Sequence, residues 1–150
     1  MPLTEQTTPH PVQILIVEDN PADARLVREV MRDSKILNEI NWVSDGVEAL
    51  AFLRNQGKYA NAPRPNLIFL DLNMPRKDGR EVLREIKADP VFRSIPVVVM
   101  TSSQAEEDIA RAYDQHANCY VRKPIDFSQF HGVVKSIETF WFATVELPPA

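Results

Sequence analysis

Short apolar runs alternate along the chain with amphipathic segments, and the alternation repeats five times. The runs are rich in Val, Ile and Leu and almost continuously apolar, which is typical of strands buried on both faces of a sheet. We expect strands at residues 13–17, 39–43, 67–70, 97–100 and 119–121. The segments that follow the strands carry apolar residues at helical spacing and therefore predict five helices.

Local sequence signals indicate where these helices begin and end. Asn20 is suited to cap the first helix, with a proline at its first position, and the second helix is expected to end near Gly57. The third helix spans residues 79–87 and stops before an Asp-Pro pair. The fourth begins at Ser103, which opens a Ser-x-x-Glu capping box.

The whole pattern predicts one domain of the α/β class. The last helix is expected to open at Asp126 or Ser128 and to reach about residue 142. The domain then spans residues 13–142, between an N-terminal tail at 1–12 and a C-terminal tail at 143–150. Because right-handed crossovers place helices on both faces of a parallel sheet, we expect a doubly wound (βα)5 sandwich of three layers with five parallel strands.

Composition and charge narrow the class of protein. The formal net charge of −4 argues against a nucleic-acid partner, because nucleic-acid-binding domains usually present a basic surface. The single cysteine cannot form an intrachain disulfide, and residues 1–11 lack the apolar segment of a signal peptide. Since the longest apolar runs are far too short to cross a bilayer, we expect a cytoplasmic protein with no membrane association.

Charged and hydroxyl side chains follow four of the five predicted strands. Glu18 and Asp19 come after the first strand, Asp71 after the third, Thr101 after the fourth and Lys123 after the fifth. In a doubly wound sheet the carboxyl ends of the strands share one edge, where ligands bind, so these residues are expected to converge. A lone aspartate there is more often a solvated loop charge, but the joint placement favours a site. Three carboxylates repel one another and need a cation, and hard oxygen donors suit Mg²⁺.

Four sequence motifs lie at these strand ends: E-D-N at 18–20, D-L-N-M-P-R-K-D-G at 71–79, M-T-S at 100–102 and Y-V-R-K-P at 120–124. With these motifs, the chain resembles the CheY-like receiver domain of response regulators, the phosphoacceptor module of two-component signalling. The resemblance covers residues 13–142 and implies the flavodoxin-like strand order 2-1-3-4-5. It also implies a signalling protein rather than an enzyme, with at most slow self-dephosphorylation.

The resemblance implies a role for each acidic residue at the strand ends. Asp71 would be the phosphoacceptor, a carboxylate nucleophile that attacks the phosphorus of a phosphohistidine. Asp19 and Asp71 would bind Mg²⁺ directly, and Asn73 would add its backbone carbonyl. Glu18 would hold a metal-bound water. The metal would neutralise and orient the transferring phosphoryl group.

Three further residues resemble the positions that sense the phosphoryl group in the family. Lys123 would pair with a phosphoryl oxygen as a point charge, and Thr101 would donate its hydroxyl to the same group. Tyr120 is either a core aromatic residue or the switch residue that moves inward with Thr101. The pairing of Thr101 with Tyr120 favours the switch.

Other positions are interpreted as structural. Pro124 is expected to follow a cis peptide bond, as in the family, which would turn Lys123 inward. Gly79 is interpreted as a glycine that permits a left-handed turn. Cys119 is interpreted as a packed small apolar side chain and Trp42 as a partly buried one, each on its strand.

A chain of this length leaves no room for an output domain, so the signal is expected to leave through a surface. The resemblance points to the face formed by the fourth helix, the fifth strand and the last helix. Apolar residues crowd the last helix and the tail, and one helix cannot turn all of them inward, so we expect a homodimer there. These residues are Ile137, Phe140, Trp141, Phe142, Val145 and Leu147.

The resemblance implies a sensor histidine kinase as the phosphoryl donor. Three features narrow the resemblance to one group of receivers. They are Arg76-Lys77 where many receivers carry an apolar residue, the Pro-containing loop at 58–66, and the aromatic carboxyl-terminal segment. With these features the chain resembles stand-alone regulators that partner phytochrome-type sensor histidine kinases. Onward transfer to a histidine phosphotransfer protein stays open.

Three other classes of protein share parts of this pattern. A phosphatase of the haloacid-dehalogenase type also uses an aspartate after a strand, but it needs a second aspartate two residues later, where Asn73 cannot transfer a proton. A flavodoxin-like FMN carrier needs a phosphate-binding loop after its first strand, where Glu18 and Asp19 would repel phosphate. A DNA-binding regulator needs a helix-turn-helix, for which the chain has no room.

Overall fold

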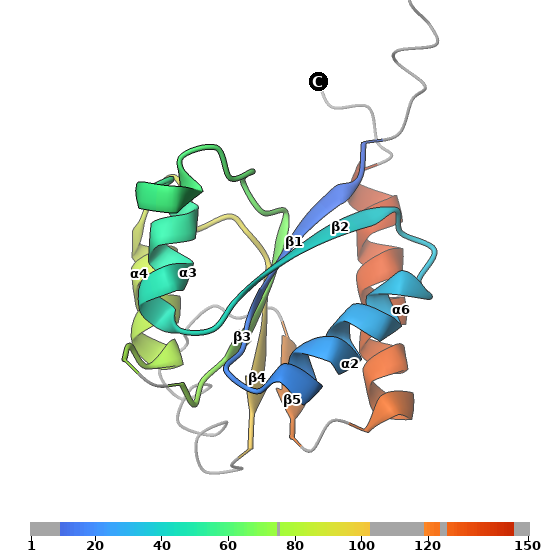
Figure 1. Cartoon of the computed structure of the whole chain (residues 1–150). Helices are drawn as coiled ribbons and strands as arrows, with labels where there is room; N and C mark the ends of the chain where they lie inside the picture. The colour runs from blue at the N-terminus through green and yellow to red at the C-terminus, as the bar shows by residue number, and fades with distance from the viewer. Residues whose placement is uncertain (1–9, 75, 103–118, 124–125, 146–150) are drawn as a thin grey trace, which may run out of the picture.

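The computed structural model describes residues 10–74, 76–102, 119–123 and 126–145, with side chains up to residue 139. Its centre is a parallel five-stranded sheet of order β2-β1-β3-β4-β5. The strands are β1 (Val12–Val17), β2 (Asn38–Val43), β3 (Leu67–Asp71), β4 (Val97–Thr101) and β5 (Cys119–Arg122). Helices α3 (Gly46–Leu53) and α4 (Gly79–Ala88) cover one face, and α2 (Pro21–Arg32) and α6 (Phe127–Val145) cover the other (Figure 1). The predicted doubly wound sandwich and its strand order are confirmed.

The sheet separates two apolar cores. Along β1, Leu15 packs on the side of α3 and α4 and Ile16 on the side of α2 and α6, because successive strand residues point to opposite faces. Phe69 of β3 meets Phe130 of α6 edge to face, with ring centroids 5.6 Å apart. All residues of β3 and β4 are buried, as expected of central strands. Packing on both faces therefore fixes the strand ends at the lower edge of the sheet in Figure 1.

The helix boundaries follow the predicted signals with two differences. Asn20 caps α2 as predicted, and its Oδ1 accepts hydrogen bonds from two backbone N–H groups of the first turn, at 2.8 and 3.3 Å. Helix α3 ends at Leu53 rather than near residue 57, because Asn55 adopts a left-handed φ of 55° and the short 3-10 helix η1 (Gly57–Tyr59) follows. Helix α6 continues to Val145, beyond the predicted end near 142.

The helix predicted to begin at Ser103 and the peptide bond before Pro124 lie outside the described residues. Among the helices that the structure describes, none is both long and apolar enough to cross a membrane.

Gly79 is required for space and not for a left-handed turn, so that interpretation was wrong. The left-handed conformation after β3 belongs to Arg76, with a φ of 68°, and Gly79 is not among the described residues with positive φ. A Cβ atom at Gly79 would overlap the backbone carbonyl oxygen of Asp71 and lie 2.6 Å from the Cα of Leu72. The first turn of α4 therefore packs directly against the backbone at the end of β3.

Candidate functional site

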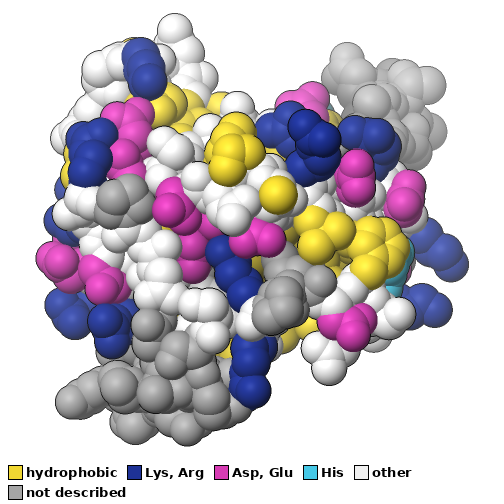
Figure 2. Space-filling model, turned by 60° about the horizontal axis from the view of Figure 1, so that its bottom comes forward, with side chains coloured by type: hydrophobic (Ala, Val, Ile, Leu, Met, Phe, Trp, Pro, Cys, Tyr) yellow, Lys and Arg dark blue, Asp and Glu magenta, His cyan; other side chains and the backbone are white. Residues whose placement is uncertain are grey.

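Three carboxylates meet at the carboxyl edge of the sheet. Glu18 and Asp19 follow β1, and Asp71 ends β3; one oxygen atom from each lies within 4.8 Å of the others. Glu18 and Asp71 are buried, whereas Asp19 is exposed. Figure 2 shows this edge, where acidic side chains gather beside a basic one near the middle of the face. We refer to Glu18, Asp19 and Asp71 as the acidic cluster.

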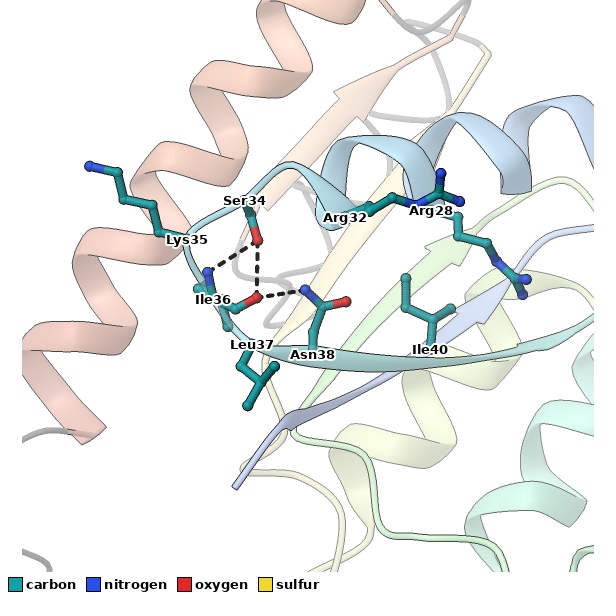
Figure 3. Close-up of a pocket in the computed structure, with 8 residues that line it drawn as sticks. All are labelled: Arg28, Arg32, Ser34, Lys35, Ile36, Leu37, Asn38 and Ile40. Atoms are coloured by element: carbon teal, nitrogen blue, oxygen red, sulfur yellow. Dashed lines mark hydrogen bonds between the residues drawn. The ribbon is translucent and has the colours of Figure 1, made fainter. Parts of the chain in front are cut away.

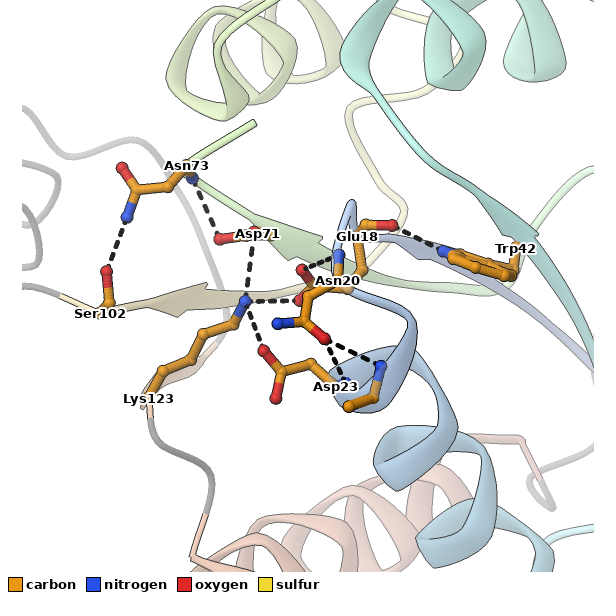
Figure 4. Close-up of polar contacts among 9 residues, drawn as sticks. Glu18, Asn20, Asp23, Trp42, Asp71, Asn73, Ser102 and Lys123 are labelled. Carbon is orange, nitrogen blue, oxygen red and sulfur yellow. Dashed lines mark hydrogen bonds and ion pairs between the residues drawn. The ribbon is translucent and has the colours of Figure 1, made fainter. Parts of the chain in front are cut away.

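Lys123 carries its ammonium into the middle of this group (Figure 4). The Nζ lies 2.7 Å from Glu18 Oε1 and 3.2 Å from Asp71 Oδ2. A third carboxylate, Asp23 Oδ2 in the first turn of α2, lies 3.0 Å away. Sequence reasoning missed Asp23; its position one helical turn after Asp19, on a helix that starts at the site, was the available signal. The Lys123 backbone is fixed as well, since its N–H donates to the carbonyl of Thr101 at 2.7 Å.

Burial and charge shift the ionisation of the three central groups. Burial raises the pKa of Glu18 from an ordinary 4.5 to about 8, and the charge of Asp71 adds to this, although Lys123 and the Asn20 N–H partly lower it. Burial also raises the pKa of the Asp71 carboxyl. Burial alone would lower the pKa of Lys123, but its hydrogen bond to Glu18 and the charges of Glu18 and Asp71 outweigh that effect and raise it. Lys123 therefore stays protonated, and its single positive charge faces more carboxylates than it can neutralise.

Hydrogen bonds to the start of α2 and to β2 hold Glu18 in place. The Asn20 N–H donates to Glu18 Oε2 at 3.0 Å, and the indole N–H of Trp42 donates to the Glu18 backbone carbonyl at 2.6 Å. The side chain of Trp42, interpreted as partly buried, is 40% exposed. Trp42 instead ties the end of β2 to the loop after β1, which orients the acidic cluster.

The segment after Asp71 is fixed by hydrogen bonds on both sides. The backbone N–H of Asn73 donates to Asp71 Oδ1 at 3.0 Å, and the Asn73 side chain donates to Ser102 Oγ at 3.0 Å. Thr101 is fully buried at the end of β4. Tyr120 of β5 is half-buried against the core on the side of α3 and α4. Thr101 follows Met100, which pairs with Asp71 in the register of β3 and β4, whereas Tyr120 pairs with Val99 and lies one strand further out, on β5.

A second anchor holds the left-handed residue Arg76. Its guanidinium donates to Asp45 Oδ2 at 2.9 Å, and the Asp45 side chain is only 7% exposed. The other oxygen of Asp45 caps α3 by accepting the Glu48 N–H at 2.8 Å. The loop that follows Asp71 is therefore tied to the start of α3 through Arg76.

The acidic cluster has the donor chemistry of a divalent-cation site. Its ligands are hard carboxylate oxygens from two neighbouring strand ends, two of them buried and repelling each other. Glu18, Asp19 and Asp71 each offer one carboxylate oxygen close enough to the others to hold a cation, and the Asn73 N–H bonds to Asp71 beside them. The residues present therefore fit a Mg²⁺-type ion.

A hollow of about 560 Å³ lies at the opposite edge of the sheet (Figure 3). It is formed where α2 ends and β2 begins, and its lining residues are Arg28, Arg32, Ser34, Lys35, Ile36, Leu37, Asn38 and Ile40. The polar side chains of Ser34 and Asn38 bond to nearby backbone carbonyls, which shapes the turn. We refer to this hollow as the basic pocket, because Arg28, Arg32 and Lys35 are among its lining residues.

Comparison with known proteins agrees with this geometry. The sequence matches the response regulator receiver domain over residues 14–135. It is 50% identical over 148 residues to response regulator Rcp1 of Synechocystis sp., covering 99% of this chain and 100% of Rcp1. The crystal structures of the phosphorylated cyanobacterial phytochrome response regulator RcpA and of Mn²⁺-bound Rcp1 are each 52% identical, with TM-scores of 0.78 and coverage of 93% of this chain and 100% of theirs. The chain belongs to the response regulator receiver family.

Proposed function

We propose that this response regulator is a switch in which Asp71 accepts a phosphoryl group from a sensor histidine kinase. The observation that carries the proposal is the setting of Asp71, a 1% exposed carboxylate within the acidic cluster and 3.2 Å from the Lys123 ammonium. Buried groups of opposite charge with shifted pKa values gather at functional sites, because holding them there costs stability.

The transfer forms one bond and breaks another. An oxygen of Asp71 attacks the phosphorus of a phosphohistidine, and the new O–P bond forms as the P–N bond breaks. The imidazole nitrogen keeps the electron pair of the broken bond and is left as neutral histidine once proton balance with solvent is restored. Lys123, already beside Asp71, balances the negative charge that arrives with the phosphoryl group.

A divalent cation, Mg²⁺ in this proposal, would be held by Asp19, Asp71 and the Asn73 carbonyl, with Glu18 acting through water. When bound, it supplies positive charge that neutralises and orients the phosphoryl oxygens. Asn73 lies two residues after Asp71 and cannot act as a general acid or base, so the protein is proposed to hold its phosphoryl group and to lose it at most slowly.

The similarity to phytochrome response regulators supports a phytochrome-type kinase as the donor. RcpA is described as a phosphorylated cyanobacterial phytochrome response regulator, and it aligns over its whole length with this chain. The Arg76–Asp45 contact gives a structural basis for the arginine of the basic pair at 76–77, one of the features that resemble those regulators.

The function is tested by labelling. The wild-type protein, incubated with acetyl phosphate and Mg²⁺, is expected to gain one phosphoryl group in intact-mass spectra, and the label should be released by hydroxylamine. Asp71→Asn should remain unlabelled, whereas the matched variant Asp33→Asn, at the far end of α2, should label normally. A label that survives in Asp71→Asn or resists hydroxylamine contradicts the proposal. Transfer from a phytochrome-type kinase that outpaces transfer from an unrelated kinase would support the partner.

The output is proposed to pass through Thr101 and Tyr120 to a face that includes β5 and α6, and to promote a homodimer. Ile137 is half-buried against the core beneath α6. The side chains of Phe140, Trp141, Phe142 and Val145, and residue Leu147, lie outside the described part. Sedimentation velocity with and without phosphodonor is expected to show a dimer that tightens on phosphorylation. A monomer in both states, or a dimer unaffected by deleting residues 140–150, contradicts this proposal, and a monomer that passes its label to a histidine phosphotransfer protein identifies a relay.

A further inference from the structure

Asp23 differs from the other two carboxylates that contact Lys123. Glu18 and Asp71 belong to the acidic cluster, whereas Asp23 lies outside it. Asp23 sits in the first turn of α2, and the Asn20 cap accepts a hydrogen bond from its backbone N–H at 3.3 Å. Its side-chain oxygen nevertheless reaches the Lys123 ammonium at 3.0 Å, close to the 2.7 Å distance to Glu18.

This arrangement has a consequence for cation binding. A divalent cation and the Lys123 ammonium would draw on the same oxygens, because two of the three partners of Lys123 are members of the acidic cluster. Like charges at such short range repel, most strongly where water is largely excluded, and the Lys123 side chain is 13% exposed. Among the residues that the structure describes, Asp23 is the one carboxylate contact of Lys123 that such a cation leaves unshared.

We propose that Asp23 is a positioning residue that holds the Lys123 ammonium to one side while a divalent cation occupies the acidic cluster. Asp23 thereby allows the metal and the lysine to be present together, as phosphoryl transfer to Asp71 requires. The inference rests on the proposed function, since it assumes that the cluster binds a divalent cation.

The competing explanation is that Asp23 only stabilises α2. An acidic residue in the first turn of a helix interacts favourably with the helix dipole, and that role does not involve Lys123. The two explanations differ in whether the effect of Asp23 on Mg²⁺ affinity depends on Lys123. If Asp23 acts through Lys123, its effect on Mg²⁺ binding must disappear when the ammonium is removed; if it acts through the helix or as a plain charge, the effect persists.

A double-mutant cycle on the full chain makes this test, with Mg²⁺ as the only ligand. We expect Asp23→Asn to weaken Mg²⁺ binding about tenfold in calorimetric titrations, and Asp23→Glu to restore much of it. In a Lys123→Met background, Asp23→Asn should change the affinity less than about twofold. Asp33→Asn, which removes the same charge from the other end of α2, should leave Mg²⁺ binding unchanged. Circular dichroism checks that each variant folds.

A spectroscopic readout keeps the inference testable if Lys123→Met does not fold. The ¹⁵N-labelled Lys123 ammonium of the Mg²⁺-loaded wild type is expected to give a protected NMR signal, which Asp23→Asn should broaden or abolish. Equal weakening in both backgrounds, an unchanged affinity in Asp23→Asn, or a wild type that binds no Mg²⁺ would overturn the inference. Failure of the proposed function is seen separately, as labelling that does not depend on Asp71 while the Asp23–Lys123 coupling persists.

Discussion

The two ends of α2 border two oppositely charged regions, and only one of them has the features of a site. At its start, Asp23 contacts Lys123 beside the acidic cluster, in which Glu18 and Asp71 are at most 1% exposed. At its end, Arg28, Arg32 and Lys35 line the basic pocket with exposed side chains. Within the described residues these three basic side chains form no ion pair, whereas Lys123 forms three.

The helix dipole accounts for the sign of the charge at both ends of α2, so sign alone does not identify function. Burial makes the difference. Charges exposed to water have little effect on folding stability, whereas buried carboxylates lower it unless they are paired. Such buried groups are usually retained because they have a function. The basic pocket is explained by an ordinary helix end and a turn, whereas the acidic cluster has the features that the proposed binding of a cation and a phosphoryl group requires.

Removing one basic charge from each region should change the free energy of unfolding by very different amounts. Lys123→Met leaves two buried carboxylates without their ammonium and is expected to lower the free energy of unfolding of the metal-free protein by roughly 3–5 kcal/mol. Arg32→Met, in the basic pocket, should change it by less than about 0.5 kcal/mol. Urea unfolding in EDTA measures both, and losses of similar size would contradict the contrast.

A glycine exchange tests whether the backbone under Asp71 is tightly packed. In Gly79→Ala the new methyl group would overlap the Asp71 carbonyl, so we expect a loss of about 3 kcal/mol in the free energy of unfolding. Gly132→Ala on α6 is the matched control, because a Cβ there meets nothing within 4 Å, and it should stabilise the protein by about 0.5–1 kcal/mol. If the two substitutions have the same sign, the close contact at Gly79 is absent in solution.

We expect a smaller change in the free energy of unfolding from the titration of Glu18 in the metal-free protein. Because the pKa of Glu18 is raised to about 8, the folded metal-free protein keeps a proton that the unfolded chain releases above pH 4.5. Its contribution is therefore complete below pH 4.5 and is lost as the pH rises through about 8, with a slope of at most about 1.4 kcal/mol per pH unit.

Urea unfolding in EDTA between pH 5 and pH 8 measures that slope. Glu18→Gln should flatten it, and Glu29→Gln, on the exposed side of α2, should leave it as in the wild type. A slope that survives in Glu18→Gln would assign it to another group.

The fold and the outline of the site could be predicted because both follow from repeating patterns. Alternation of buried strands and amphipathic helices determines the sandwich, and the carboxyl ends of parallel strands must share an edge. Glu18, Asp71 and Lys123 therefore come together whatever the details of packing.

The remaining features depend on contacts between segments that no local pattern reports. The Trp42 indole bonds to a backbone carbonyl 24 residues away, and Asp23 reaches a lysine on another strand end. The space requirement at Gly79 arises from the approach of α4 to β3, which a search for turn glycines cannot detect. The sequence therefore predicts the residues at the strand ends, but not the contacts of Trp42, Asp23 and Gly79 that hold them in place.

The central claim is that the acidic cluster supports the transfer of a phosphoryl group to Asp71. The most direct measurement is to find which residue carries the phosphoryl group. The protein, phosphorylated in the presence of Mg²⁺, is reduced with borohydride, which converts an acyl phosphate of aspartate to homoserine, and is then mapped by tandem mass spectrometry. The account predicts homoserine at position 71 only, and none when Mg²⁺ is omitted. Homoserine at Asp19 or Asp23, or a phosphoryl group that borohydride does not remove, would contradict it.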